Sequence, residues 1–293
     1  MSVFIPASLQ NTIGEFGEEG AEWLNSLPER IAALEREWGL RAGPAFDHAG
    51  ACSWIAPVTL ESGDEAILKI GLPHEEARFE ADALRFLDGQ GAVCLLRASD
   101  DGFSLLLERC LPGTDLWSLR EDEADAVVAA LLPRLWREPG PNAPFIALTD
   151  IVARWCEELP REAPAAGYDV EMVAEAIARG RELAASQPQQ VFLHGDFNPG
   201  NVLAAQREPW LVIDPKPIVG DPAYDFAQWL GNRYDSAIQS ADPVSVFRRQ
   251  IDRFAERLAL DPARIAGWAF VKALGWEFGP EMAALFHKVA QAW

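Results

Sequence analysis

The sequence has few cysteines, few histidines, few basic residues and no long hydrophobic run. Its four cysteines are far apart and form no C-x-x-C pair, and none of its four histidines pair at a zinc-like spacing. These absences argue against a disulfide framework or a zinc site, and they favour free thiols in a reducing compartment. No apolar run approaches membrane-spanning length, and the N-terminus lacks the basic region and apolar core of a signal peptide. We therefore expect a cytoplasmic protein without a membrane partner.

Basic residues are outnumbered by acidic ones. The chain carries 25 Lys and Arg against 45 Asp and Glu, which gives a formal net charge of −20. Nucleic acid is not an expected partner, because its phosphates would be repelled. The negative charge permits a cationic small-molecule ligand. The length of 293 residues suffices for one large domain or for two lobes.

The most informative stretch is HGDFNPGNVL, residues 194–203, followed by LVIDP at 211–215. Two short apolar runs flank a turn, and the pattern places Asp196, Asn201 and Asp214 at loop and strand ends. Two carboxylates and an amide oxygen suit a hard cation such as Mg²⁺. A carboxylate that is not bound to the metal is able to accept a proton from a hydroxyl.

This stretch resembles the catalytic loop H-x-D-x-x-x-x-N and the metal-binding Asp of the kinase fold. The form HGD, with DP in place of DFG, is similar to the aminoglycoside phosphotransferase family. The sequence of residues 191–227, which begins with VFLHGD and ends with GDPAYDFA, is similar to the streptomycin and hydroxyurea kinase branch of that family. The resemblance implies an α+β, two-lobed protein-kinase-like fold with a β-rich N-lobe and a mostly helical C-lobe. It also implies ATP, or GTP in its place, and Mg²⁺ as cofactors.

The resemblance assigns roles to individual residues. Asp196 accepts or orients the acceptor hydroxyl, and Asn201 and Asp214 bind Mg²⁺. Lys69 ends an apolar strand and orients the nucleotide phosphates, as the strand lysine of kinases does. Glu80 matches the helix position that pairs with this lysine. Glu76, one helical turn earlier, is the competing choice.

Three further residues are candidates for the nucleotide site. Ser53 lies before a strand, in the place of a phosphate-covering loop, although the segment AGACSW is not the glycine-rich motif of protein kinases. The resemblance implies that main-chain groups near Glu108 and Cys110 contact the purine, because kinase-like folds hold adenine where an apolar strand runs into the linker between the lobes. Ser53 as a plain turn residue stays an open alternative.

Hydrophobic periodicity predicts the N-terminal elements. A helix is expected first, with Pro28 starting a second one, and an antiparallel sheet with one inserted helix follows. The predicted ranges are helix 17–40, strands 54–60 and 65–70, helix 75–87, and a hairpin of 95–99 with 103–108. The resemblance places the lobe boundary after residue 110, so residues 1–110 are expected to form the nucleotide lobe, with a helical extension at 1–40.

Residues 111–293 are expected to form a helical lobe that carries catalysis and acceptor binding. Asp225 either caps the helix that follows it or holds the catalytic loop. The predicted helices are 124–136, 149–159, 170–185, 226–231, 243–258, 262–276 and 280–293, and the predicted strands are 201–204 and 211–213.

The function expected from the resemblance is phosphorylation of a hydroxyl on a small molecule, either a streptomycin-like aminoglycoside or hydroxyurea. A cationic acceptor would need further carboxylates, and the candidates are Glu157, Glu158 and Glu277, with Trp276 able to stack on a guanidinium. The alternatives are a small-alcohol kinase of the choline or homoserine type and a catalytically silent kinase-like binding protein. A two-metal phosphoesterase is disfavoured, because only His194 lies near the carboxylates.

Overall fold

The computed structural model describes residues 3–47, 50–163, 165–275 and 279–293. The chain divides into two compact units. Unit 1 consists of Met1–Thr114 and Ala204–Ile213, and unit 2 consists of Asp115–Leu203 and Asp214–Trp293. The chain therefore leaves unit 1 after Thr114 and returns to it for one short segment. None of the helices in the described ranges is both long enough and apolar enough to cross a bilayer.

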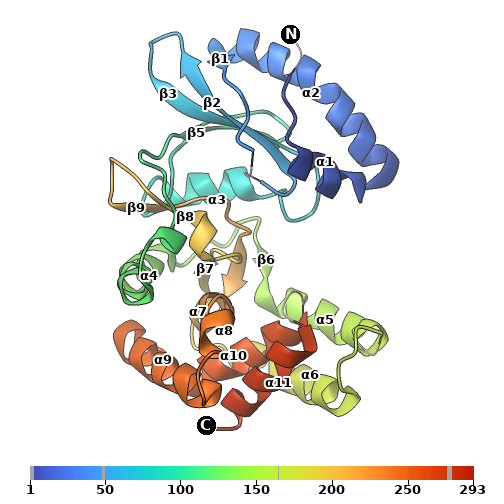
Figure 1. Cartoon of the computed structure of the whole chain (residues 1–293), viewed down its shortest axis with the longest axis vertical. Helices are drawn as coiled ribbons and strands as arrows, with labels where there is room; N and C mark the ends of the chain where they lie inside the picture. Colours follow the sequence, from blue (N-terminus) through green and yellow to red (C-terminus); the bar gives the residue numbers. More distant parts are fainter. Residues whose placement is uncertain (1–2, 48–49, 164, 276–278) are drawn as a thin grey trace. The chain divides into compact units, whose positions relative to one another are not determined.

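Unit 1 is built on a five-stranded sheet in the order β1-β2-β3-β5-β4 (Figure 1). All neighbouring strands in it are antiparallel. The strands are β1 (Leu40–Ala42), β2 (Ser53–Leu60), β3 (Glu65–Gly71), β4 (Leu95–Ala98) and β5 (Ser104–Glu108). The predicted strands are present, and β1 is an addition that periodicity alone did not indicate because it is so short.

Two N-terminal helices, α1 (Ala7–Gly14) and α2 (Gly17–Trp38), cover one face of this sheet. Apolar side chains of α2 and of alternate strand positions form one buried cluster. The prediction that Pro28 starts a second helix is wrong, because α2 continues through it. Leu27 and Ile31 on either side are buried against the sheet, and this burial offsets the hydrogen bond that proline cannot donate.

Helix α3 (Glu80–Leu87) lies on the opposite face of the sheet (Figure 1). The periodicity had predicted that this helix begins at residue 75, but it begins at Glu80. Residues 75–79 form turns, and the Ala83 N–H donates to the Phe79 carbonyl over 2.9 Å at the start of the helix. The apolar spacing of Phe79, Ala83 and Phe86 continues into the turn, which is why the pattern overestimated the helix.

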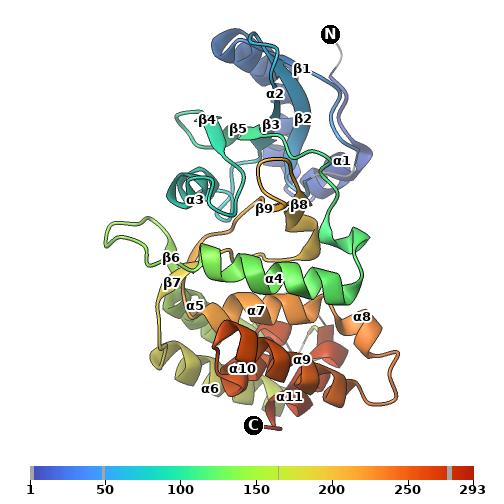
Figure 2. The same cartoon turned by 90° about the vertical axis from the view of Figure 1, so that its left-hand side faces the viewer.

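Unit 2 contains a small three-stranded sheet in the order β6-β10-β7. It also contains most of the helices (Figure 2). Helix α10 packs against α6, α7, α9 and α11, and most of its residues are buried. The strands are β6 (Ile146–Ala147), β7 (Val191–Leu193) and β10 (Ile218–Gly220). The helices are α4 (Glu121–Leu135), α5 (Leu148–Glu162), α6 (Val170–Ala185), α7 (Pro222–Gly231), α8 (Tyr234–Ala237), α9 (Pro243–Leu258), α10 (Pro262–Gly275) and α11 (Gly279–Ala290). The predicted helices are all present within a few residues, whereas β6, β7 and β10 were not predicted.

The buried carboxylate of Asp221 ties α7 to α10. One oxygen caps α7 by accepting the Ala223 N–H at 3.0 Å. The other accepts the Trp268 indole N–H at 2.9 Å and the Arg264 Nε–H at 2.6 Å. Each donor and acceptor in this group is therefore paired, which a buried charge requires.

Replacement of Asp221 by Ala should lower the free energy of unfolding by about 3–5 kcal/mol, because the Arg264 charge and the Trp268 N–H lose their shared acceptor. Asp261→Ala is the matched control, since its exposed carboxylate caps the start of α10 through the Ala263 N–H. Loss of such a cap costs about 0.5–2 kcal/mol. Urea unfolding followed by circular dichroism measures both. Equal losses in the two variants would contradict the role given to Asp221.

Candidate active site

In unit 1, Lys69 and Glu80 form a buried ion pair. The lysine Nζ lies 2.8 Å and 2.7 Å from the two carboxylate oxygens, and the residues are 7% and 3% exposed. Neighbouring Leu68 and Ile70 face the cluster under α2, so strand alternation turns Lys69 to the face covered by α3. A buried ammonium needs such a partner. Of the two glutamates considered, the structure pairs Glu80 with Lys69, and Glu76 is exposed.

Ser53 is the first residue of β2 and not a loop or turn residue before the strand, as the sequence had indicated. It lies on the same face of the sheet as Lys69. Ile55 pairs with Lys69 across β2 and β3, and Ser53 is two positions from Ile55 and pairs with Gly71. Its hydroxyl lies 3.5 Å from the point that a Cβ on Gly71 would occupy. Ser53 is buried, and its contact with phosphate stays a prediction.

At the end of β5, the side chain of Glu108 has a bracing role that the sequence did not indicate. Its carboxylate accepts the Cys94 N–H at 2.9 Å and is held by Arg207 at 2.9 Å and 2.8 Å. Burial raises the pKa of Glu108, but the hydrogen bonds from Arg207 and Cys94 outweigh it, and the pKa lies below its ordinary value. Glu108 therefore stays ionised and holds the strand end in place.

Cys110 follows two residues later. Burial, with a smaller contribution from the charge of Glu108, raises the pKa of its thiol to about 11. The thiol is thus protonated at neutral pH and is not a nucleophile. The main-chain contacts with a purine that we predict for this strand end stay a prediction.

Arg207 comes from the turn between β8 (Val202–Ala204) and β9 (Trp210–Val212). In addition to Glu108, its guanidinium donates to the Gly89 and Ala92 carbonyls, each at 2.7 Å. One planar cation therefore joins the segment after α3, the end of β5 and the β8–β9 turn within unit 1. The expected strands around this turn are present, and the arginine was not a predicted site residue.

In unit 2, the predicted catalytic loop, residues 194–201, follows β7 and is held by the buried carboxylate of Asp225. Its two oxygens accept the His194 and Gly195 backbone N–H groups at 2.8 Å and 2.9 Å. The Trp136 indole N–H adds a contact of 3.3 Å. Of the two roles open for Asp225, the structure shows the loop-holding one, because Asp221 caps α7.

Gly195 is required by the close approach of a second loop. Its φ is +80°, a region that disfavours side chains. A Cβ at this position would lie 2.0 Å from the Lys216 carbonyl oxygen. The Lys216 N–H also donates to the His194 carbonyl at 2.8 Å. The glycine of HGD thus allows the segment after Asp214 to pack on the catalytic loop.

Both oxygens of Asp196 are held by amides of its own loop. Asn198 Nδ2 donates to Oδ1 and Asn201 Nδ2 donates to Oδ2, each at 3.0 Å. The Asn198 side-chain oxygen in turn accepts the Gly200 N–H at 2.9 Å. Each carboxylate oxygen keeps a lone pair for a further proton donor. Asn198 was missed, because an Asn two residues after an Asp is equally typical of an ordinary turn.

The donor set around Asn201 and Asp214 fits a hard cation. The Asn201 amide hydrogens point to Asp196, both to its carboxylate and to its carbonyl at 2.9 Å, which leaves the Asn201 side-chain oxygen as a ligand. Asp214 has a φ of +54°, and its Oδ1 already lies 3.1 Å from the Lys216 ammonium. One carboxylate and one amide oxygen are typical of Mg²⁺ sites in which phosphates and waters supply the remaining ligands. Within the described ranges, no three His, Cys, Asp or Glu side chains gather as a metal cluster.

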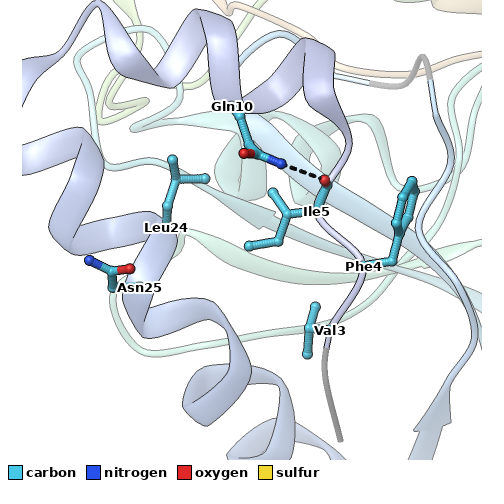
Figure 3. A pocket seen from close by; sticks show the side chains of 6 residues that line it. All are labelled: Val3, Phe4, Ile5, Gln10, Leu24 and Asn25. Atoms are coloured by element: carbon cyan, nitrogen blue, oxygen red, sulfur yellow. Dashed lines mark hydrogen bonds between the residues drawn. The ribbon is translucent and has the colours of Figure 1, made fainter.

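A hollow of roughly 530 Å³ also opens in unit 1, beside α1 and α2 (Figure 3). Gln10 on its wall donates to the Ile5 carbonyl at 2.8 Å. Its lining is Val3, Phe4, Ile5, Gln10, Leu24 and Asn25. None of the candidate site residues lines it.

Comparison with known proteins identifies the family. Residues 42–276 match the family described as aminoglycoside/hydroxyurea antibiotic resistance kinase. The chain belongs to this kinase family. It is 38% identical to a streptomycin 6-kinase of Streptomyces glaucescens, over 92% of this chain and 89% of that one. It is 39% identical to a hydroxyurea phosphotransferase of Kitasatospora aureofaciens, over 79% of this chain and 69% of that one.

The fold of this kinase is shared with a solved aminoglycoside phosphotransferase, a thermostable mutant in a ternary complex with ADP and hygromycin B. The TM-score is 0.53 at 18% identity, over 89% of this chain and 96% of that one. The predicted α+β kinase-like fold and the prediction of a phosphotransferase are confirmed. The relatives do not favour the small-alcohol kinase or the silent binding protein.

Replacement of Gly195 by Ala should lower the free energy of unfolding by more than about 2 kcal/mol, because a left-handed φ alone costs about 1–2 kcal/mol and the clash with Lys216 adds to it. Gly63→Ala tests the conformation by itself, since its φ is +90° with nothing within 4 Å of the new Cβ. Gly140→Ala has the same open space without the positive φ. Urea unfolding and nucleotide turnover measure all three variants. A Gly195→Ala variant no worse than Gly63→Ala would contradict the close packing.

Proposed function

We propose that this kinase transfers the γ-phosphoryl group of ATP, or of GTP in its place, to a hydroxyl of a streptomycin-like aminocyclitol with the help of Mg²⁺. The observation that carries the proposal is the carboxylate of Asp196, oriented by Asn198 and Asn201 in a loop braced by Asp225. The names of the relatives support the acceptor class. The ADP complex of a protein of the same fold supports a nucleotide as donor.

In the proposed reaction, Asp196 accepts the proton of the acceptor hydroxyl. The hydroxyl oxygen forms a bond to the γ-phosphorus while the bond between that phosphorus and the β–γ bridging oxygen breaks, and ADP leaves with the bridging electrons. The amide donors of Asn198 and Asn201 keep the carboxylate in one orientation, so little reorganisation is needed. His194 is buried against Phe197, and we assign it to bracing the loop and not to proton transfer.

The remaining residues bind the nucleotide. We assign Lys69 to the nucleotide phosphates and Glu80 to holding Lys69 in position, as the buried ion pair suggests. Asn201 and Asp214 would hold Mg²⁺, which neutralises charge on the phosphates when bound. Ser53 and the main chain near Glu108 and Cys110 would complete the nucleotide site. Residues 1–110 were predicted as the nucleotide lobe and residues 111–293 as the lobe for catalysis and the acceptor. Because Ala204–Ile213 belongs to unit 1, we assign the nucleotide role to unit 1 with this segment, and catalysis and the acceptor to unit 2.

The net charge of −20 suits a cationic acceptor. On α5, Glu157 is exposed and Glu158 is partly buried, and either carboxylate is available to attract a guanidinium. The other two predicted contacts, Trp276 and Glu277, lie outside the described residues. Hydroxyurea is the second candidate acceptor, because one relative with 39% identity is named for it.

Replacement of Asp196 by Asn should lower kcat by on the order of 10²–10⁴, because the amide keeps the shape of the side chain but does not accept the proton. Nucleotide binding should persist, which calorimetry with ADP and Mg²⁺ measures. Asp235→Asn, on the short helix α8, is the matched control and should turn over normally. Undiminished turnover in Asp196→Asn would remove this residue from the mechanism.

Streptomycin should be phosphorylated with an apparent affinity that falls as ionic strength rises, because salt screens the attraction between a cation and an acidic protein over about 10 Å at 0.1 M. The measurement is phosphate transfer from labelled ATP to streptomycin, hydroxyurea and choline at low and high salt. Transfer to hydroxyurea alone, or salt-independent use of a neutral acceptor, would reject the cationic acceptor.

A further inference from the structure

Lys216 follows Asp214 by two residues, and its backbone is fixed against the catalytic loop. Its N–H donates to the His194 carbonyl at 2.8 Å. Its carbonyl oxygen occupies the space beside Gly195, 2.0 Å from where a Cβ would lie. The backbone of Lys216 is therefore in contact with two consecutive residues that precede Asp196. The Cα position from which the Lys216 side chain extends is therefore fixed by these backbone contacts.

The side chain of Lys216 turns back to Asp214. Its ammonium lies 3.1 Å from Asp214 Oδ1, and the two side chains are 24% and 29% exposed. Asp214 adopts a φ of +54°, which is unusual for a residue with a side chain. The pair thus combines an anchored lysine with a carboxylate in a constrained backbone conformation. An ordinary surface ion pair has neither feature.

This arrangement places a cation of the protein on the carboxylate to which the proposed function assigns Mg²⁺. An ammonium and a divalent ion on the same carboxylate oxygen would repel each other strongly at such short range. Binding of the metal at Oδ1 therefore requires Lys216 to withdraw, and binding at the other oxygen leaves the repulsion only partly relieved. Either way, the lysine opposes metal binding.

We propose that Lys216 is a positioning residue that holds the Asp214 carboxylate before the metal arrives and competes with the metal for it. The inference rests on the proposed function, because it takes Asp214 as a metal ligand. The lysine keeps Asp214 aligned and partly neutralised while the metal is away. The contact between Lys216 and Asp214 lowers the affinity of the site for the divalent ion. The lower affinity eases release of the metal with ADP after the phosphoryl transfer.

The direct test is binding of Mn²⁺ in the presence of ADP, with free Mn²⁺ followed by electron paramagnetic resonance. Lys216→Met should bind Mn²⁺ roughly two- to five-fold more tightly than the unaltered protein, which corresponds to the loss of one partly exposed ion pair. Lys216→Arg keeps the charge and should bind Mn²⁺ as the unaltered protein does. Lys288→Met changes the net charge equally at an exposed position on α11 and should leave the affinity unchanged.

Thermal unfolding gives a second readout that a purely structural lysine would not produce. Without metal, Lys216→Met should melt at a lower temperature than the unaltered protein, because Asp214 loses a partner. Mg²⁺ with ADP should then raise its melting temperature by more than it raises that of the unaltered protein, since tighter binding to the folded state stabilises it further. Lys216→Gln retains a hydrogen-bond donor without the charge, and Mg²⁺ with ADP should raise its melting temperature by the same larger amount. This variant replaces Lys216→Met in the test if Lys216→Met does not fold.

Two outcomes would overturn the inference. Unchanged or weaker Mn²⁺ binding in both Lys216→Met and Lys216→Gln would show that the lysine does not compete with the metal. Asp214→Asn separates this failure from failure of the proposed function. If that variant loses Mn²⁺ affinity while the Lys216 variants gain none, only the inference falls. If Asp214→Asn binds Mn²⁺ normally, the metal assignment in the proposed function falls together with the inference.

Discussion

The hydrogen bonds that Asp225 accepts from the backbone of His194 and Gly195 are the constraint on which the predicted catalytic loop depends. A fully buried carboxylate is stable only when its oxygens are paired, and two backbone N–H groups and the Trp136 indole supply that pairing. Because the two N–H groups belong to consecutive residues, His194 and Gly195, they fix the direction of the backbone just before Asp196. The Asp196 carboxylate that follows is then oriented by short-range amide contacts from Asn198 and Asn201.

A second layer of contacts joins the two loops of unit 2. The left-handed Gly195 allows the Lys216 carbonyl to approach, and the Lys216 N–H reaches the His194 carbonyl. The position of Asp214 thus depends on the same backbone that positions Asp196. In this chain the glycine of HGD therefore has a packing reason that is separate from the chemistry of its neighbours.

The sequence was most informative where a family motif could be matched residue by residue. The resemblance to kinases paired Lys69 with Glu80, which the structure confirms, and the motif spacing brought Asn201 to Asp196. Prediction failed where a tertiary contact decides. Burial against the sheet carries α2 through Pro28, and α3 starts at Glu80 although its apolar pattern extends further. Asn198, Arg207 and Lys216 were not predicted, because each belongs to a common residue type in a turn, and only the folded chain shows what it contacts.

The guanidinium of Arg207 has a consequence for the length of the turn that carries it. Exposed turns between strands usually tolerate insertions and deletions, because lengthening a loop costs little entropy. The β8–β9 turn is different, since Arg207 must reach the Gly89 and Ala92 carbonyls and Glu108 simultaneously. One added or deleted residue would break several charge-assisted hydrogen bonds at once. An open turn such as that around Gly63 has room for a change of length, whereas the contacts of Arg207 require the β8–β9 turn to keep its present length.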